Sequence, residues 1–265
     1  MTSVLHIDGA PATIEDLTHV ALVNYGAYTS FRVERGGVRG LDLHLARLAA
    51  SAVELFGQAV GEARLRELMR GAVGERPSCW LRVSLFAPEI GMRDPSWRGS
   101  PRVMIGAFPP PQPLADALRV QVQTYEREAS HLKHAATFGL VRARRAAQDA
   151  GFDDALFVDG HGRISEGSLW NIGFLRGDEV VWPRAPMLAG VAQALIGRGL
   201  ATVGLTDRTE DISLDDLDGF DAAFACNSAT PACPVTVIGE RAFPSAPGLI
   251  ARLQAAWASN PPELI

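Results

Sequence analysis

A proline run near the middle of the chain, FPPPQP at residues 108–113, limits the folds that this sequence can adopt. Prolines fix the backbone angle φ and lack an N–H donor, so the run cannot continue a helix or a central strand. Such a run is typical of a stiff connector. We therefore expect two domains, at residues 1–107 and 119–265, joined by a proline-rich linker at residues 108–118.

Both halves mix helical and strand patterns, which predicts an α+β fold. Apolar residues at helical spacing favour a helix after residue 40, with Leu41, Leu45, Leu48, Val53 and Phe56 on its inner face. Further helices are expected at residues 62–73, 139–151 and 190–204. Alternating or apolar runs predict strands or hairpins at residues 4–9, 22–40, 78–87, 102–108, 118–125, 154–165, 169–183 and 220–240.

Composition excludes several classes of function. The net charge of −5 and the lack of a basic tail argue against nucleic acid as a partner, and no apolar run is long enough to span a membrane. The first residues show no signal-peptide pattern. Cys79, Cys226 and Cys233 are odd in number and lack zinc spacing, so we expect reduced thiols, no metal and a cytoplasmic protein.

The chain has 25 basic residues, and Lys133 is the only lysine among them. Arginine can replace lysine in most surface contacts, but it cannot lose its proton or form a Schiff base with a carbonyl. Lys133 lies among Leu, Ala, His, Thr and Phe rather than in a charge cluster. A chemical role is therefore one interpretation, and a surface lysine left by an arginine-rich codon bias is the other.

Four further positions are weak signals of a ligand site. Glu166 follows a strand and precedes the small residues of EGS, although a surface turn would look the same. Gly190 begins a helix whose N–H groups suit a phosphate, although most helix starts bind nothing. Arg47 adjoins an apolar helix face, and Ser228 lies in a polar turn after a strand.

In this order and spacing, these residues resemble the class IV aminotransferase family of fold-type IV pyridoxal-phosphate enzymes. That family includes branched-chain and D-amino-acid aminotransferases and aminodeoxychorismate lyase. The resemblance covers about residues 20–240. It rests on NYGAYTSFRV, HLARL, HLKH, WPRAPMLAGV and CNSATPACPV, and most specifically on GFDDALFVDGHGRISEGSLWNIGF.

The resemblance implies a two-domain fold-type IV structure, a homodimer, and pyridoxal 5'-phosphate bound between the domains. Lys133 would carry the cofactor as a Schiff base and move the substrate proton, and Glu166 would bind the pyridine nitrogen. Arg47, the N–H groups of Val191 and Ala192, and Ser228 would bind the phosphate. A carboxylate on the pyridine nitrogen keeps the ring protonated, so that it can accept electrons.

The sequence departs from the family pattern at two places. Many members carry a tyrosine five residues after the lysine, where this chain has Phe138. A threonine common at the helix start is replaced here by Ala192. Another tyrosine or a water would then contact the ring oxygen, or that oxygen would be held less well.

The resemblance places the substrate pocket on two strands of the first half. Strand alternation puts Tyr28 and Arg32 on one face of the first strand, and Trp80 and Arg82 on one face of the second. Arg82 matches a substrate-contacting position of branched-chain aminotransferases. An arginine there suits a carboxylate, although it could instead pair with an acid at the edge of the core.

The leading hypothesis is a pyridoxal-phosphate-dependent aminotransferase that acts on a small amino acid or amine and a 2-oxo acid. A lyase like aminodeoxychorismate lyase is the alternative, because HLKH and YTSFRV also resemble that branch. A binding protein that has lost catalysis, and a Schiff-base enzyme without cofactor, remain further alternatives. The sequence leaves the substrate and its chirality open.

Overall fold

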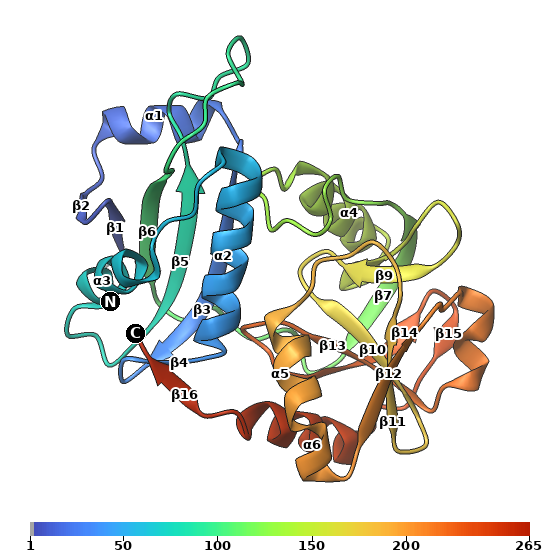
Figure 1. Cartoon of the computed structure of the whole chain (residues 1–265). Coiled ribbons are helices and arrows are strands. Elements are labelled where there is room, and N and C mark those ends of the chain that lie inside the picture. Colours follow the sequence, from blue (N-terminus) through green and yellow to red (C-terminus); the bar gives the residue numbers. More distant parts are fainter. Residues whose placement is uncertain (1–2) are drawn as a thin grey trace. The chain divides into compact units, whose positions relative to one another are not determined.

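The structure, a computed structural model, describes residues 3–265. The chain forms two compact units (Figure 1). The first comprises residues 1–111, 132–136 and 262–265, and the second comprises residues 112–131 and 137–261. Both units contain helices and strands, so the α+β prediction is confirmed.

The first unit is built on a seven-stranded sheet in the order β16-β4-β3-β5-β6-β1-β2, with every pairing antiparallel. Its helices are α1 (Ile14–Leu22), α2 (Leu41–Phe56) and α3 (Glu62–Val73). Its strands are β1 (Val4–Ile7), β2 (Ala10–Pro11), β3 (Gly26–Glu34), β4 (Gly37–Arg39), β5 (Ser78–Phe86), β6 (Arg102–Phe108) and β16 (Pro262–Leu264).

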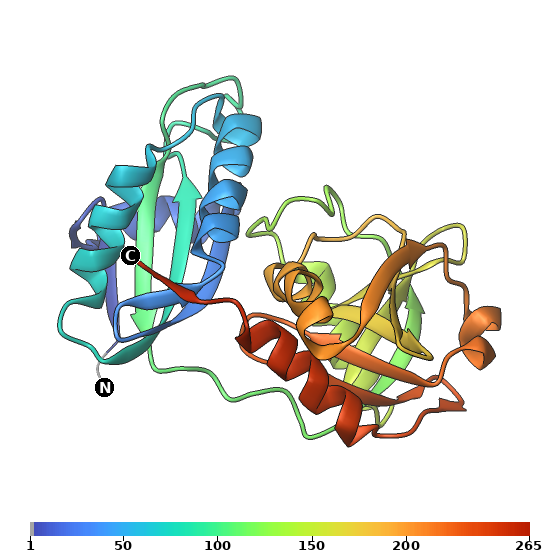
Figure 2. The same cartoon turned by 60° about the horizontal axis from the view of Figure 1, so that its bottom comes forward.

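Helices α2 and α3 lie along one face of this sheet, and Figure 2 shows both beside the strands. Alternate residues of β3 and β5, including Phe31, Leu81 and Val83, point into the core beneath them. The prediction that Val53 belongs to the inner face of α2 is wrong, because this side chain is 54% exposed. Val53 directly follows the buried Ala52. Because one residue turns a helix by about 100°, the Val53 side chain points away from the buried face.

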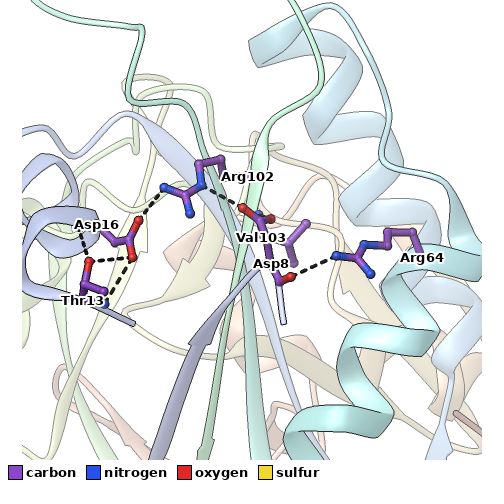
Figure 3. A network of polar contacts seen from close by, with 6 residues as sticks. All are labelled: Asp8, Thr13, Asp16, Arg64, Arg102 and Val103. Carbon is purple, nitrogen blue, oxygen red and sulfur yellow. Dashed lines mark hydrogen bonds and ion pairs between the residues drawn. The ribbon is translucent and has the colours of Figure 1, made fainter. Parts of the chain in front are cut away.

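A polar network attaches the N-terminal hairpin and α1 to the sheet (Figure 3). Arg102 on β6 donates from Nε to Asp8 over 2.7 Å and from Nη1 to Asp16 over 2.6 Å. Arg64 on α3 donates to the Asp8 carbonyl over 2.9 Å. Thr13 and Asp16 form a capping box at the start of α1. These contacts matter because α1 buries none of its own side chains.

We expect α1 to detach in acid. The hydrogen bond from Arg102 lowers the pKa of Asp16 below its ordinary value of 3.8, and those from Thr13 add to it. The detached segment therefore binds more protons than the attached one. The attachment is complete above pH 3.8 and is lost as the pH falls through the lowered pKa of Asp16. Amide hydrogen exchange of residues 14–22 should accelerate in that range. The Asp16→Asn variant should lose this pH dependence, and unchanged behaviour in that variant would contradict the assignment.

The second unit is built on a nine-stranded sheet in the order β12-β11-β10-β13-β14-β7-β8-β9, with β15 paired to β14. An additional pairing of β9 with β10 closes part of this path into a ring. Its strands are β7 (Leu118–Thr124), β8 (Asp154–Val158), β9 (Ile164–Gly167), β10 (Asn171–Arg176), β11 (Glu179–Pro183), β12 (Thr206–Glu210), β13 (Ala222–Cys226), β14 (Cys233–Ile238) and β15 (Arg241–Ala242).

Helices pack against this sheet in two places. Helix α4 (Phe138–Asp149) covers β7 and β8 through a small apolar cluster around Phe157. Helices α5 (Val191–Gly199) and α6 (Pro247–Ala258) lie side by side, as Figure 2 shows, and share a core with Trp182 and Phe224. Short 3₁₀ turns occupy Leu200–Val203 and Leu214–Gly219. No helix within residues 3–265 is long and apolar enough to cross a membrane.

Two short segments that follow the proline run belong with the first unit, although the sequence suggested one continuous second domain. Residues 132–136 bridge to β3, and residues 262–265 extend the sheet as β16 beside β4. Arg66 donates to the carbonyl of Leu264 over 2.7 Å. Arg70 donates to the carbonyl of Ile265 over 3.0 Å. Backbone pairing across the sequence therefore decides which unit these segments join.

Candidate functional site

Lys133 is held at an edge of β3 in the first unit. Its carbonyl accepts the N–H of Tyr28 over 2.8 Å, and the N–H of Ala135 donates to the carbonyl of Gly26 over 2.8 Å. The preceding Leu132 is buried in the core of this unit. The Lys133 Nζ lies 5.1 Å from the centre of the Tyr28 ring. The backbone of the only lysine is thus fixed by sheet pairing, while its amine lies beside an aromatic ring.

The sheet face opposite α2 and α3 carries the predicted substrate residues. Tyr28 pairs in register with Ser84, and Arg32 pairs with Trp80, so all lie on one face of neighbouring strands. The guanidinium of Arg82 lies 3.6 Å above the centre of the Tyr28 ring. In contrast, Arg32 forms an ion pair with Glu34 over 3.4 Å. The structure therefore brings Tyr28, Arg82 and Lys133 together and leaves Arg32 engaged elsewhere.

Helix α2 presents Arg47 one turn after a buried histidine that the sequence analysis missed. His44 is 1% exposed, and its Nδ1 lies 2.6 Å from the Thr29 hydroxyl. Burial lowers the pKa of His44 to about 3, and the charges of Arg47 and Lys133 act in the same direction. The imidazole is therefore neutral at neutral pH. A histidine three residues before an arginine on an amphipathic helix was the available signal.

In the second unit, Glu166 on β9 is a buried carboxylate, only 7% exposed. Its Oε2 accepts the N–H of Leu188 over 3.2 Å, and its Oε1 lies 3.6 Å from Nε of Arg127. Arg127 is buried too, and its Nη2 donates to the carbonyl of Ser130. A buried carboxylate of this kind is stabilised by the neighbouring cation.

Sequence reasoning missed Arg127, because the surrounding YEREAS looks like an exposed charged turn. The small residues after Glu166 have packing and hydrogen-bonding roles of their own. A side chain at Gly167 would lie 2.2 Å from the Trp170 ring. The Ser168 hydroxyl donates to Asp154 over 2.6 Å. These residues pack the Trp170 side chain and satisfy a buried acid.

The loop before α5 is tied to the same strands as Glu166. Asn171 pairs with Glu166 in register and donates from Nδ2 to the carbonyl of Leu188 over 2.8 Å. A Cβ at Gly190 would lie 1.9 Å from the Asn171 amide oxygen, so only glycine fits there. The first hydrogen bond inside α5 runs from Ala194 to Gly190, which leaves the N–H groups of Val191 and Ala192 ahead of the helical ladder.

Ser228 lies in the turn after β13, whose last residue, Cys226, pairs with Asn171. The side chain of Asn227 accepts the N–H groups of Ala229 and Thr230 over 2.9 and 2.8 Å, which fixes this turn. Contacts through Asn171 thus connect the surroundings of Glu166, the start of α5 and the Ser228 turn. Oriented N–H groups at a helix start suit an anion.

The predicted site residues therefore fall into two groups, each assembled within its own unit. Those of the first unit are Tyr28, Arg32, Arg47, Trp80, Arg82 and Lys133, and those of the second are Glu166, Val191, Ala192 and Ser228.

The structure shows the surroundings of Phe138, one of the two departures from the family pattern. Phe138 is the first residue of α4 and is 79% exposed. The next residue, Gly139, faces Tyr125, whose hydroxyl would lie 2.1 Å from a Cβ at that glycine. A tyrosine hydroxyl thus lies one residue from the position where Phe138 lacks one.

Comparisons with known proteins identify the family of the chain. The family model for amino-transferase class IV matches residues 26–238. The chain belongs to the class IV aminotransferase family. Enzymes of this family use pyridoxal phosphate, so the predicted family, enzyme class and cofactor are confirmed.

Individual relatives are distant. A probable branched-chain-amino-acid aminotransferase of Rickettsia bellii is 25% identical over 231 residues, covering 82% of this chain and 79% of that protein. The fold IV-transaminase CpuTA1 of Curtobacterium pusillum is 24% identical, with a TM-score of 0.76 over 95% of this chain and 89% of that one. A Brucella abortus aminotransferase solved with PLP is 18% identical, with a TM-score of 0.81 over 98% and 99%. These likenesses confirm the fold-type IV prediction.

The residues of this class IV chain fit the cofactor. The separation of 3.6 Å between Arg127 Nε and Glu166 Oε1 is too long for a hydrogen bond, and this Nε is buried without an acceptor among residues 3–265. A buried carboxylate such as Glu166 suits a protonated pyridine nitrogen, which would donate a hydrogen bond to it. The start of α5 suits a phosphate, and Lys133 is the one lysine that could bind an aldehyde.

Proposed function

We propose that the protein moves an amino group between a small amino acid or amine and a 2-oxo acid, with pyridoxal phosphate attached covalently to Lys133. The observation that carries this proposal is the position of the only lysine, fixed beside Tyr28 and Arg82 in a member of the class IV family. When bound, the cofactor withdraws electrons from the α-carbon of the substrate.

Each predicted site residue has a separate role in the proposed reaction. Glu166 accepts a hydrogen bond from the protonated ring nitrogen of the cofactor. The N–H groups of Val191 and Ala192, together with Arg47 and Ser228, bind its phosphate. Arg82 binds the substrate carboxylate. Lys133 would hold the cofactor through its amine, and that amine would carry the α-proton of the substrate. A neutral His44 nearby adds no positive charge to this amine.

The lyase alternative gains no support from a specific contact. A chorismate-derived substrate has two carboxylates, and Arg32, the candidate for the second anchor, forms an ion pair with Glu34. The alternative of a binding protein without catalysis conflicts with the presence of Lys133, Glu166 and Arg47 together. We also propose a homodimer, which sedimentation of the cofactor-loaded protein will test.

A panel of amino donors, added without a 2-oxo acid, tests the function. Transfer should convert the absorption of the bound cofactor to that of its amine form, and an added 2-oxo acid should reverse the change. If pyruvate is released from aminodeoxychorismate and no donor yields the amine form, the protein is a lyase. If neither reaction occurs in cofactor-loaded protein, the catalytic proposal is wrong.

Arg47→Ala should weaken cofactor binding by about 1.5 to 3 kcal/mol, the range for a hydrogen bond to a charged group. Excess cofactor should restore much of the activity by mass action. Equilibrium dialysis of the apoprotein measures the effect, and Arg47→Lys, which keeps the charge, should lose less. An unfolded variant that no cofactor concentration rescues would show that Arg47 instead supports the packing of α2.

A further inference from the structure

Arg127 is a buried cation just after the end of β7. The N–H of Tyr125 donates to the carbonyl of Val158 over 3.1 Å, so the chain still runs beside β8 two residues before Arg127. In the sheet order β7-β8-β9, the strand that carries Glu166 follows β8. The side chain of Arg127 is 6% exposed and that of Glu166 is 9% exposed. The second unit therefore buries this cation and this acid together.

The backbone after Arg127 folds back and holds the guanidinium. Ala129 has a positive φ of 45°, which is uncommon for a residue other than glycine. The turn brings the carbonyl of Ser130 to Arg127, whose Nη2 donates a hydrogen bond to it. The local chain thus orients the guanidinium through a contact that does not involve Glu166.

Arg127 and Glu166 interact through charge rather than through a hydrogen bond. Arg127 Nε lies 3.6 Å from Glu166 Oε1, beyond the range of about 2.7 to 3.2 Å for an N–H···O bond, and it has no acceptor within residues 3–265. A pair that served the fold alone would gain from closing this gap, because charge-assisted hydrogen bonds are strong. The arrangement instead keeps a positive charge beside the carboxylate without a hydrogen bond from Nε to Oε1.

Two contacts favour the ionised form of Glu166 against the effect of burial. Removal from water disfavours a charged carboxylate, whereas a nearby cation and hydrogen bonds to the carboxylate favour it. The N–H of Leu188 donates to Oε2 over 3.2 Å. Arg127 supplies the opposite charge, and a guanidinium remains protonated in proteins. Of these two contacts, that with Arg127 is the one that compensates the buried charge.

The state of Glu166 decides where a shared proton lies. A hydrogen bond between a carboxyl group and a pyridine nitrogen contains one proton, which lies either on the oxygen or on the nitrogen. In a buried site without a further charge, the neutral pair is favoured. A cation beside the carboxylate favours its ionised form by about tenfold to a thousandfold, which moves the proton to the nitrogen. A protonated ring nitrogen is what allows the cofactor to accept electrons.

We propose that Arg127 is a positioning residue whose charge keeps Glu166 ionised and thereby keeps the shared proton on the ring nitrogen of the cofactor. This inference rests on the proposed function, in which Glu166 accepts a hydrogen bond from that nitrogen. Arg127 acts through Glu166 and contacts neither cofactor nor substrate. Loss of its charge should slow the amino-transfer half-reaction about tenfold to a hundredfold, although Glu166 is still present.

The ionisation of Glu166 is measured on the apoprotein by infrared difference spectroscopy, which distinguishes a buried protonated carboxyl group from carboxylates. Arg127→Met should show the protonated band at neutral pH, and adding Glu166→Gln should remove it. Arg127→Gln, which keeps an N–H donor, is a second neutral variant in case the first does not fold. The wild type and Arg127→Lys should lack the band. A protonated Glu166 in the wild type, or none in a folded neutral variant, would overturn the inference.

Two further variants separate the charge from the turn that carries it. Arg127→Lys keeps the charge and should restore the rate of the half-reaction to within about fivefold of the wild type. Ala129→Gly alters the turn without changing any charge, so it should change thermal stability and leave the rate nearly unchanged. An equal loss of rate in Ala129→Gly and Arg127→Met would overturn the inference, because the turn rather than the charge would then be responsible.

The closing experiment locates the proton itself. The protein is loaded with pyridoxal phosphate labelled with ¹⁵N in the ring, and the nitrogen chemical shift distinguishes the protonated from the neutral ring. The shift should be that of a protonated ring in the wild type and move towards the neutral value in Arg127→Met and in Glu166→Gln. Arg119→Met, the same change at an exposed arginine on β7, is the matched control and should have no effect.

The two variants distinguish the failure of this inference from the failure of the proposed function. A shift that responds to Glu166→Gln but not to Arg127→Met would overturn the inference and leave the proposed role of Glu166 intact. A shift that responds to neither variant would overturn both.

Discussion

Lys133→Arg should abolish covalent attachment of the cofactor and lower the rate of amino transfer about a thousandfold or more. In the proposed function this side chain is both the amine that binds the aldehyde and the base that moves the α-proton, and a guanidinium can do neither. Arginine keeps the positive charge beside Tyr28 and His44, so the substitution tests the chemistry of the amine rather than the charge.

Borohydride reduction and peptide mapping measure the attachment. The wild type should yield one adduct, on the peptide that contains Lys133, and the variant should yield none. The variant should still fold, because Lys133 contacts β3 through its carbonyl. Thermal unfolding serves as the control for this point. An adduct on another peptide, or full turnover by the variant, would restore the interpretation of a surface lysine.

Local patterns in the sequence predicted the elements that carry strong periodicity. The alternation in residues 78–87 correctly assigned Trp80 and Arg82 to the face opposite the core, since β5 buries Leu81 and Val83 beneath α2 and α3. Helix α1 was missed; it is only nine residues long, and none of its side chains is fully buried. Helix α6 was also missed, because its first two residues are Pro247 and Gly248; the preceding Ala246 has a positive φ of 42°.

The chemistry of the site was readable from residue types, but its contacts were not. A lone lysine can be recognised in any sequence, whereas the backbone pairing of Lys133 with Tyr28 joins residues more than a hundred positions apart. No local period records such a contact. Arg127 was missed for a similar reason: Glu166, its buried partner, lies on β9, far from it in the sequence. Long-range pairing therefore determines which charged residues are buried.

Glu166→Gln should slow transfer about a hundredfold or more while the protein still binds cofactor. The carboxylate charge stabilises the protonated ring nitrogen, and loss of one preorganised electrostatic contact of this kind costs about that much in rate. Phosphate contacts through Arg47 and the start of α5 do not involve Glu166, so affinity should fall far less. Rapid-mixing measurement of the half-reaction gives the rate, and fluorescence titration of the apoprotein gives the affinity.

The same substitution also leaves Arg127 buried without its anion, which has to be separated from the catalytic effect. Breaking one side of a buried ion pair typically costs about 3 to 5 kcal/mol of stability. Glu166→Gln combined with Arg127→Met removes both charges and should recover much of that stability without recovering the rate. Glu126→Gln, an exposed acid near Arg127, is the matched control and should change neither quantity. If the double variant regained the rate, the loss would come from the unpaired arginine, and Glu166 would have no direct part in catalysis.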